Sequence, residues 1–418
     1  MSDNIRKYLK FNYALNLSEA SFWGLGAGLA SSTAVIPLFL SKYTDSAILF
    51  GLIPAIQTIG FQLPQLFMAK QVASNRLVRP IVMRNTIHER IPYLGMAFVA
   101  LFADQLPPAL VVSLLFLMII WQGIGGGITG NAWQIMITKI IPSDIRSMFF
   151  SIQGAGVNFL TSAGAYISGV VLERNSTNFG FFLCFLFGFI AMATSYVLLG
   201  KVREEPSTEI INAGKSEPIL KSAMRILKAD KDFRSFVLVR FLTPFSTMAS
   251  AFFTIYVIKY FDASEITVGS MTSLLFISTV ISGLVLGWVS DHMGRKFAML
   301  LSLAIMAVTS FFAFFGNTLV VFYVVFFLTG VINGSFWSVF LSFSLEFGST
   351  KTRPTYVGLI NTLIAPSTLI AQLLGGLLAD TLSYKVTFLT AGIFGILTFL
   401  ITLVFVNIPR KSKELQSA

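Results

Sequence analysis

The sequence predicts an all-α integral membrane protein built from twelve transmembrane helices in two six-helix bundles. Of its 418 residues, 55% are hydrophobic and only 12% are charged. Soluble domains are about 45–50% apolar, so this composition excludes a soluble globular fold. Apolar runs close to the roughly 20 residues that cross a bilayer as a helix recur along the whole chain. The second half of the chain also repeats features of the first, which predicts the two bundles.

The apolar runs define the twelve expected spans. They lie at residues 15–41, 47–69, 87–103, 109–138, 147–172, 179–200, 235–258, 267–290, 297–315, 318–345, 354–379 and 386–407. Between the sixth and seventh runs, residues 201–234 form a long hydrophilic segment. We therefore expect an N-terminal six-helix bundle at residues 1–200, a cytoplasmic linker at residues 201–234 and a C-terminal six-helix bundle at residues 235–418.

The basic residues predict the orientation in the membrane. If the N-terminus is cytoplasmic, all but five of the 30 Lys and Arg residues fall on the cytoplasmic side. Lys42, Arg174, Lys259 and Lys385 face outward, and Arg240 lies inside a span. Cytoplasmic loops of membrane proteins carry an excess of Lys and Arg, so the net charge of +11 indicates orientation rather than a nucleic acid partner. We expect a multi-pass protein of the cell membrane with both termini in the cytoplasm.

Three ungapped shifts relate the two halves of the chain. A shift of 207 residues places Arg146 on Arg353, Gly169 on Gly376 and Glu173 on Asp380; a shift of 204 places Gly126, Gly130 and Trp133 on Gly330, Gly334 and Trp337; and a shift of 217 places Lys42, Tyr43 and Asp45 on Lys259, Tyr260 and Asp262. Matches in the same order indicate a duplication, and therefore two bundles related by a pseudo-two-fold axis along the membrane normal. We expect a substrate to bind between the bundles.

A short charged segment, GWVSDHMGRK at residues 287–296, separates the eighth and ninth spans. Gly287 is small enough to let a neighbouring helix approach closely, and Gly294 permits a tight turn with positive φ. Asp291 can cap the positive end of a helix, while Arg295 and Lys296 supply cytoplasmic charge. These five residues form a candidate conformational hinge motif.

The spacing G-x-x-x-D-x-x-G-[RK]-[RK] resembles the signature of the loop between spans 8 and 9 in the major facilitator superfamily, with His292 in place of the usual basic residue. Span count, repeat and linker agree with this resemblance, which covers nearly the whole chain. It implies a secondary transporter that moves a small organic solute across the lipid bilayer by alternating access of two rocking bundles. It also implies that Asp291 caps the start of span 11 near Arg353, and that the protein functions as a monomer without a cofactor.

The mode of transport stays open between several alternatives. Proton-coupled efflux is one, although the arginine that many antiporters of this family carry in span 4 is absent, with Trp121 and Gln122 in that region. The others are a uniporter or symporter for a sugar, peptide or other metabolite, and a receptor or scaffold that does not transport. A membrane enzyme acting on lipid would need a nucleophile, base or metal cluster, but the two histidines, His88 and His292, lie at the membrane edge. We therefore expect no enzyme activity.

Two ionisable residues within the spans are candidate coupling or charge-recognition groups. Each charge at mid-depth costs about 3 kcal/mol on the insertion scale, so such residues usually have a function. The shift of 217 residues places Glu19, in span 1, one helical turn from Arg240, in span 7, and the two would face each other across the cavity. In contrast, the segment 88–90, His-Glu-Arg, opens span 3 and is interpreted as an anchor at the membrane interface.

Polar and aromatic residues at mid-depth mark a candidate substrate cavity, because unpaired amides are not expected to face lipid. They are Gln57, Asn131, Trp133 and Asn158 in the first half, and Ser246, Thr247, Asn333, Trp337 and Asn361 in the second half. For each residue taken singly, a helix-to-helix hydrogen bond is the alternative interpretation.

Motifs for nucleotides and metals fail on their context. The string at residues 125–130 satisfies GxGxxG but lies in an apolar helix with no preceding strand, so small residues such as Gly123 and Gly127 are interpreted as a helix-packing surface. The string at residues 214–216 lacks the first glycine of a P-loop, so ATP hydrolysis is not supported. Cys184 is a single cysteine, which excludes a cysteine-based metal site. We expect no metal and no cofactor.

Overall fold

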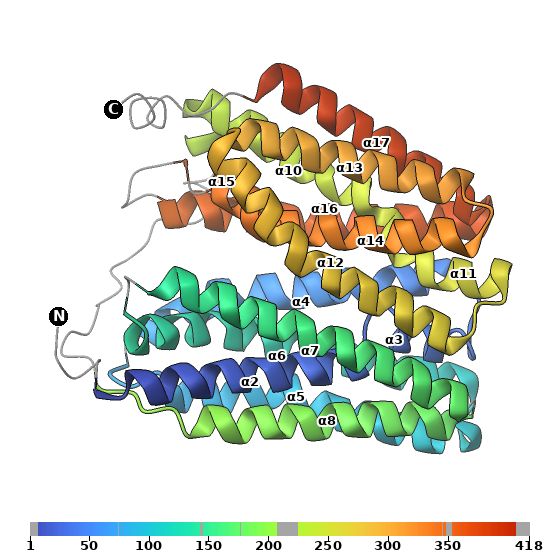
Figure 1. Ribbon diagram of the computed structural model, residues 1–418, viewed down its shortest axis with the longest axis horizontal. Coiled ribbons are helices and arrows are strands. Elements are labelled where there is room, and N and C mark those ends of the chain that lie inside the picture. Colours follow the sequence, from blue (N-terminus) through green and yellow to red (C-terminus); the bar gives the residue numbers. More distant parts are fainter. Residues whose placement is uncertain are drawn as a thin grey trace. The chain divides into compact units, whose positions relative to one another are not determined.

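The structure is a computed structural model that describes residues 7–73, 75–142, 145–175, 177–206, 225–344, 346–347 and 353–406. Side chains are described throughout these ranges except at residues 65–73, 147, 337, 341–342, 353–355, 357–358 and 361. Within these ranges the chain is helical and contains no strand (Figure 1).

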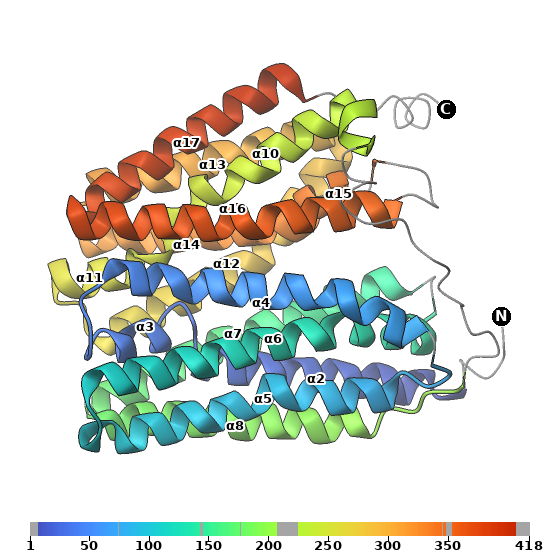
Figure 2. The ribbon, with the colours of Figure 1, turned by 180° about the vertical axis from the view of Figure 1, so that it is seen from behind.

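The first half of the chain forms six span-sized segments (Figures 1 and 2). They are α2 (Leu9–Leu29) followed by α3 (Val35–Leu40), then α4 (Ala47–Ala73), α5 (Arg79–Phe102) with the 3-10 turn η1 (Ala103–Gln105), α6 (Pro108–Ile140), α7 (Arg146–Arg174) and α8 (Asn178–Gly200). Each overlaps one predicted span. The third begins earlier than predicted, at Arg79 rather than residue 87, because the helix continues through a stretch of charged residues.

The second half forms six further segments. They are α10 (Lys231–Thr247) with η2 (Met248–Ala251) and α11 (Phe253–Phe261), α12 (Glu265–His292), α13 (Arg295–Phe315), α14 (Leu319–Ser335) with the π-helix η3 (Phe336–Leu341) and α15 (Ser342–Ser344), α16 (Arg353–Thr381) and α17 (Tyr384–Phe405). Twelve described segments therefore match the twelve predicted spans. Ten of the described helical stretches are long and apolar enough to cross a membrane. The remaining two segments, those containing α2 and α5, carry more polar residues.

Contacts between residues divide the chain into two compact units. Unit 1 comprises Met1–Asp45, Ile56–Gly214 and Asp262–Phe276, and unit 2 comprises Ser46–Ala55, Lys215–Phe261 and Ile277–Ala418. The start of α4 thus groups with unit 2, and the start of α12 groups with unit 1. The bundle and linker boundaries drawn from the sequence remain a prediction, and linker residues 207–224 lie outside the described residues.

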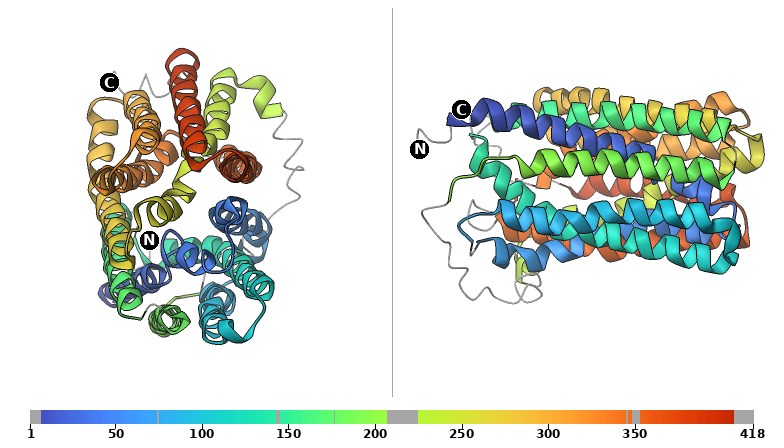
Figure 3. Two further views of the ribbon diagram at one scale, coloured as in Figure 1. Left: turned by 90° about the vertical axis from the view of Figure 1, so that its right-hand side faces the viewer. Right: turned by 90° about the horizontal axis from the view of Figure 1, so that it is seen from below.

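In unit 1, α2 packs against α7 and α8, and α5 packs against α6 and α8, so that the helices run side by side (Figure 3). Glycine permits the tightest crossing. A Cβ atom on Gly127 of α6 would collide with the carbonyl oxygen of Gly60 in α4, and one on Gly123 would lie 3.2 Å from the carbonyl oxygen of Ile56. The predicted backbone-to-backbone packing of this glycine-rich helix is confirmed.

In unit 2, α13 packs against α14 and α17, and α10 packs against α16 and α17. The core on the side of the α10 N-terminus is aromatic. Phe236 stacks on Phe347 with ring centroids 5.2 Å apart, and Phe233 meets the edge of the same ring at 5.2 Å. All three side chains are buried. These rings hold the N-terminal part of α10 and position Arg240, one turn further along the helix.

Candidate functional site

A buried ion pair lies within unit 1. Glu19 of α2 and Arg90 of α5 are joined by a 3.0 Å contact between Oε1 and Nη2, and each side chain is only 5% exposed. Ser195 of α8 donates a hydrogen bond to the same Glu19 oxygen at 2.8 Å. Three helices of the unit are thus connected through one carboxylate.

Glu89 supplies a second carboxylate to the same guanidinium. Its Oε2 lies 3.4 Å from Nη1 of Arg90, and its side chain is 13% exposed. The indole Nε1 of Trp23, in α2, donates to Glu89 Oε1 at 3.1 Å. We call Glu19, Trp23, Glu89, Arg90 and Ser195 the Glu19–Arg90 cluster.

The remaining donors of Arg90 are also paired. Nε donates to the carbonyl oxygen of Met192 at 3.2 Å, and Nη1 donates to the hydroxyl of Thr86. The guanidinium is therefore fully engaged. When both Glu19 and Glu89 are ionised, two negative charges oppose one positive charge, and binding of one proton makes the cluster neutral. Such a group can hold a proton without leaving an unpaired cation in the membrane.

The partner of Glu19 differs from the expected one. The sequence suggested that Glu19 faces Arg240, but its charge is neutralised by Arg90 within its own unit. The interfacial interpretation of segment 88–90 is also wrong for Arg90, which is 4% exposed because α5 begins three turns earlier. The sequence did contain a signal for the buried position of Arg90, since this residue falls inside the predicted span 87–103. No pattern in the sequence indicated Ser195.

A chain of polar side chains crosses unit 1 beside this cluster. Gln57 of α4 donates to Gln122 of α6 at 3.3 Å, and Gln122 donates to the hydroxyl of Tyr93, in α5, at 3.5 Å. Gln57 was a predicted cavity residue, and it is half-buried. Its amide is engaged in a helix-to-helix hydrogen bond, the alternative considered from the sequence.

Two other predicted cavity residues of the first half, Asn158 and Trp133, make separate contacts. Asn158 donates to Gly154 of its own helix at 2.9 Å, and Trp133 contacts Phe150 with ring centroids 6.2 Å apart. Asn131 is half-buried. The contacts of Asn158 and Trp133 given above involve no other predicted cavity residue.

In unit 2, Ser246 and Thr247 also make separate contacts. Ser246 lies 3.2 Å from the hydroxyl of Thr398, where both are buried, and Thr247 donates back to Thr243 within α10 at 3.3 Å. Asn333 is exposed. The side chains of Trp337 and Asn361 lie outside the described residues.

Arg240 is a charged group in the interior of unit 2. Its guanidinium carbon lies 5.4 Å from the ring centroid of Phe336 and 5.1 Å from that of Phe340. Both rings belong to the π-helical stretch that follows α14. Arginine is attracted to aromatic faces, so the rings offset part of its charge.

The hinge motif lies where α12 ends and α13 begins. Gly294 has φ of 96°, a conformation that favours glycine. Arg295 pairs with Glu346, and Lys296 Nζ donates to the carbonyl oxygen of Leu403, in α17, at 2.9 Å. The motif thus connects the start of α13 to two other parts of unit 2.

Two expectations for this motif concern Gly287 and Asp291. A Cβ atom on Gly287 would lie 3.8 Å from the Cβ of Ser338, an ordinary contact, so close helix approach does not require glycine there. Asp291 is exposed. Its expected contact near Arg353 falls on side chains outside the described residues, and that role remains a prediction.

Each unit contains a carboxylate that caps the first turn of a helix. Asp380, at the end of α16, accepts from the backbone N–H groups of Ala47 and Ile48, in α4, at 2.5 and 3.2 Å. Glu173, at the end of α7, accepts from the N–H of Ile266, in α12, at 3.3 Å. The shift of 207 residues pairs these two acids, so the repeat carries a common contact that the sequence did not assign.

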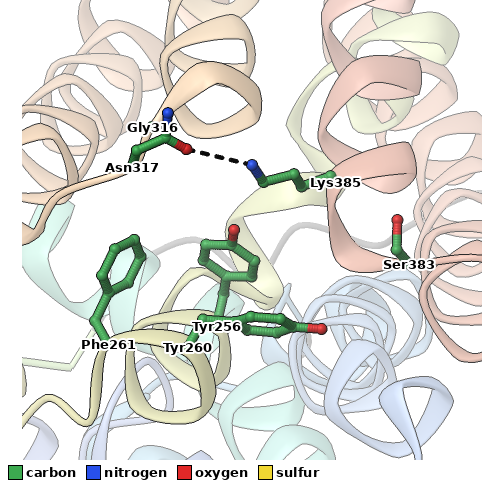
Figure 4. Close-up of a pocket in the computed structure, with 7 residues that line it drawn as sticks. All are labelled: Tyr256, Tyr260, Phe261, Gly316, Asn317, Ser383 and Lys385. Carbon is green, nitrogen blue, oxygen red and sulfur yellow. Dashed lines mark hydrogen bonds between the residues drawn. The ribbon is translucent and has the colours of Figure 1, made fainter.

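An additional cavity of about 380 Å³ lies within unit 2 (Figure 4). It is lined by Tyr256, Tyr260 and Phe261 of α11, by Gly316 and Asn317, and by Ser383 and Lys385. Lys385 Nζ donates to Asn317 Oδ1 at 3.4 Å, and the two tyrosine rings stack with centroids 4.6 Å apart. It lies near the N-terminus of α17, whereas Lys296 of the hinge motif contacts the C-terminal turn of that helix.

No cluster of three or more His, Cys, Asp or Glu side chains that could hold a metal occurs among the described residues. Two interior charge sites occur among the described residues, the Glu19–Arg90 cluster and Arg240.

The fold is similar to that of solved transporters. The structure of a D-xylose–proton symporter aligns over 96% of this chain and 99% of its own, with a TM-score of 0.75 and 17% identity. The inward-open xylose transporter of E. coli aligns over 97% and 99%, with a TM-score of 0.71 and 17% identity. A nucleoside transporter aligns over 94% and 100%, with a TM-score of 0.71 and 13% identity. These likenesses show the fold.

Sequence comparisons agree with the fold. An uncharacterized MFS-type transporter of Methanocaldococcus jannaschii is 24% identical over 170 residues, which span 40% of this chain and 44% of that relative. The chain thus matches less than half the length of this relative. The model of the Major Facilitator Superfamily matches residues 20–258 and 236–418, nearly the whole chain. The chain therefore belongs to the major facilitator superfamily.

Proposed function

We propose that this protein is a secondary transporter that moves a small organic solute across the cell membrane by alternating access. Family membership, the internal repeat and the twelve-segment fold support this function, and membership also argues against the lipid-modifying enzyme. The solved neighbours are named as transporters of xylose and nucleosides, so a sugar or another metabolite is a reasonable class of solute to test. The protein works as a monomer, with both termini in the cytoplasm.

The Glu19–Arg90 cluster carries the coupling charge. The supporting observation is that two carboxylates share one guanidinium within the buried interior of unit 1. Uptake or release of one proton changes the net charge of the cluster, and therefore the cost of keeping it away from water. Because the cluster joins α2, α5 and α8, a change in its charge would alter the packing of three helices. A uniporter would retain the cluster as a fixed structural pair.

The hinge motif controls the change between conformations. Asp291 stabilises one conformation by capping a helix, and Arg295 and Lys296 hold the start of α13. A contact made in only one state shifts the equilibrium by the free energy of that contact. The motif would therefore affect the rate of the cycle rather than the recognition of the solute.

Flux measurements in proteoliposomes test the proposal. In the first measurement, vesicles are loaded with the pH indicator pyranine, and one solute is added outside: D-xylose, uridine, an alanine dipeptide, lactate or benzoate. In the second measurement, exchange of the same solutes across the membrane is followed with radiolabel. Proton coupling predicts a solute-dependent pH change larger than that in empty vesicles, equal to the empty-vesicle level with Glu19→Gln and retained with the exposed control Glu205→Gln. Exchange without a pH change in any protein would identify the uniporter. Binding without exchange would identify a receptor and refute transport.

A further inference from the structure

Arg240 carries donors that the protein does not satisfy. Its Nε and Nη1 atoms are buried and have no hydrogen-bond partner. Among the buried groups of the described residues that lack a partner, this is the only charged side chain. Buried N–H groups are almost always paired in native proteins, so a partner that is absent from the chain itself is the simplest explanation.

Among the described residues, the contacts of the Arg240 guanidinium are with aromatic rings, which offset part of its charge. Phe336 and Phe340 lie near the guanidinium, and their rings attract a cation without accepting a hydrogen bond in its plane. A π-helical stretch places both rings on this side of α14. Such distortions are frequent at functional sites.

Arg90 provides an internal comparison. It lies in the interior of unit 1, and its guanidinium reaches Glu19, Glu89, the hydroxyl of Thr86 and the carbonyl oxygen of Met192. The same chain thus pairs one interior arginine completely and leaves the other with open donors. An interior arginine with no anionic partner among the described residues is best explained by an anion that arrives from outside.

We propose that Arg240 binds the oxyanion of the transported solute, so that the solute is a small organic anion such as a carboxylate. Guanidinium N–H groups match the two oxygens of a carboxylate in spacing and direction. Arg240 is half-buried as a residue, while its Nε and Nη1 atoms are buried, so an anion reaches these donors when the packing around the guanidinium opens during the transport cycle. The statement that the anion is transported rests on the proposed function, whereas binding of the anion to Arg240 can be tested separately.

The test is thermal unfolding of the purified full-length protein with matched acids and amides. The pairs are benzoate and benzamide, lactate and lactamide, and succinate and succinamide, with inorganic phosphate as a further anion, all at equal ionic strength. The variants are Arg240→Gln, which removes the charge, and Arg240→Lys, which keeps the charge but loses the planar fork. Arg234→Gln is the matched control, since Arg234 is an exposed arginine of the same helix.

At least one anion should raise the melting temperature of the wild type and of Arg234→Gln, while its amide should not. Loss of a charge-assisted hydrogen bond should weaken that binding on the order of tenfold to a hundredfold in Arg240→Gln. Arg240→Lys should bind with intermediate affinity. If Arg240→Gln fails to fold, the Arg240→Lys comparison decides.

Three results would overturn the inference. The first is that no anion stabilises the protein beyond its amide, and the second is an anion effect of wild-type size in both Arg240→Gln and Arg240→Lys. The third is an Arg240-dependent stabilisation that phosphatidylglycerol reproduces and the solutes do not. The last result would assign the site to a lipid headgroup. Failure of the proposed function is recognised differently. In that case an anion binds through Arg240, but no solute crosses the membrane in the flux measurement.

Discussion

Removing either partner of the buried pair should have unequal effects on stability. Glu19→Gln leaves Arg90 with Glu89 at 3.4 Å, with the Thr86 hydroxyl and with the Met192 carbonyl oxygen. Arg90→Gln instead leaves two carboxylates in a protein interior without a cation. Breaking a buried pair by removing one partner costs about 3–5 kcal/mol. We expect about 3 kcal/mol for Glu19→Gln and about 5 kcal/mol for Arg90→Gln, because only the latter leaves uncompensated charge.

The free energies of unfolding would be measured in mixed micelles titrated with denaturing detergent. A double-mutant cycle with Glu19→Gln and Arg90→Gln should give a coupling energy of about 2–3 kcal/mol, since the 3.0 Å contact is lost in each single variant. The exposed control Glu205→Gln should stay within about 0.5 kcal/mol of the wild type. Equal costs for the two single variants, or a coupling energy near zero, would refute the view that Arg90 neutralises the cluster.

Three further predictions concern other parts of the fold. Asp380→Asn and Glu173→Gln should each lower stability by about 0.3–1 kcal/mol, because each removes a negative charge from the first turn of a helix. Thermal unfolding at low and high salt would show whether salt screens this effect. Gly127→Ala should destabilise by about 1–3 kcal/mol because its Cβ meets the backbone of α4, whereas Gly154→Ala, with no atom within 4 Å, should be tolerated in the same unfolding assay. Asp291→Asn should slow solute exchange more than it weakens solute binding, and unchanged exchange at normal expression would remove the hinge motif from the cycle.

Hydropathy alone predicted the number and approximate limits of the helical segments. This works because a backbone in lipid must satisfy its hydrogen bonds within each helix, so a run of apolar residues has few alternatives. The repeat also related two residues that make the same kind of contact, since the shift of 207 residues pairs Glu173 with Asp380. The glycines of α6 likewise indicated close packing from spacing alone.

The partners of the interior charges were decided by tertiary structure. Helical periodicity assigns a residue to a face, but it does not say which helix covers that face. Glu19 meets Arg90 across 71 residues and Ser195 across 176 residues, separations at which no local rule operates. The same limit applies to Arg240, whose open donors could be recognised only after its neighbours were placed. The sequence determined that charged residues lie within the spans. Packing between helices decided which charge the protein neutralises, that of Arg90, and which it leaves with open donors, that of Arg240. The reason is that pairing depends on distances between helices that are far apart in the chain.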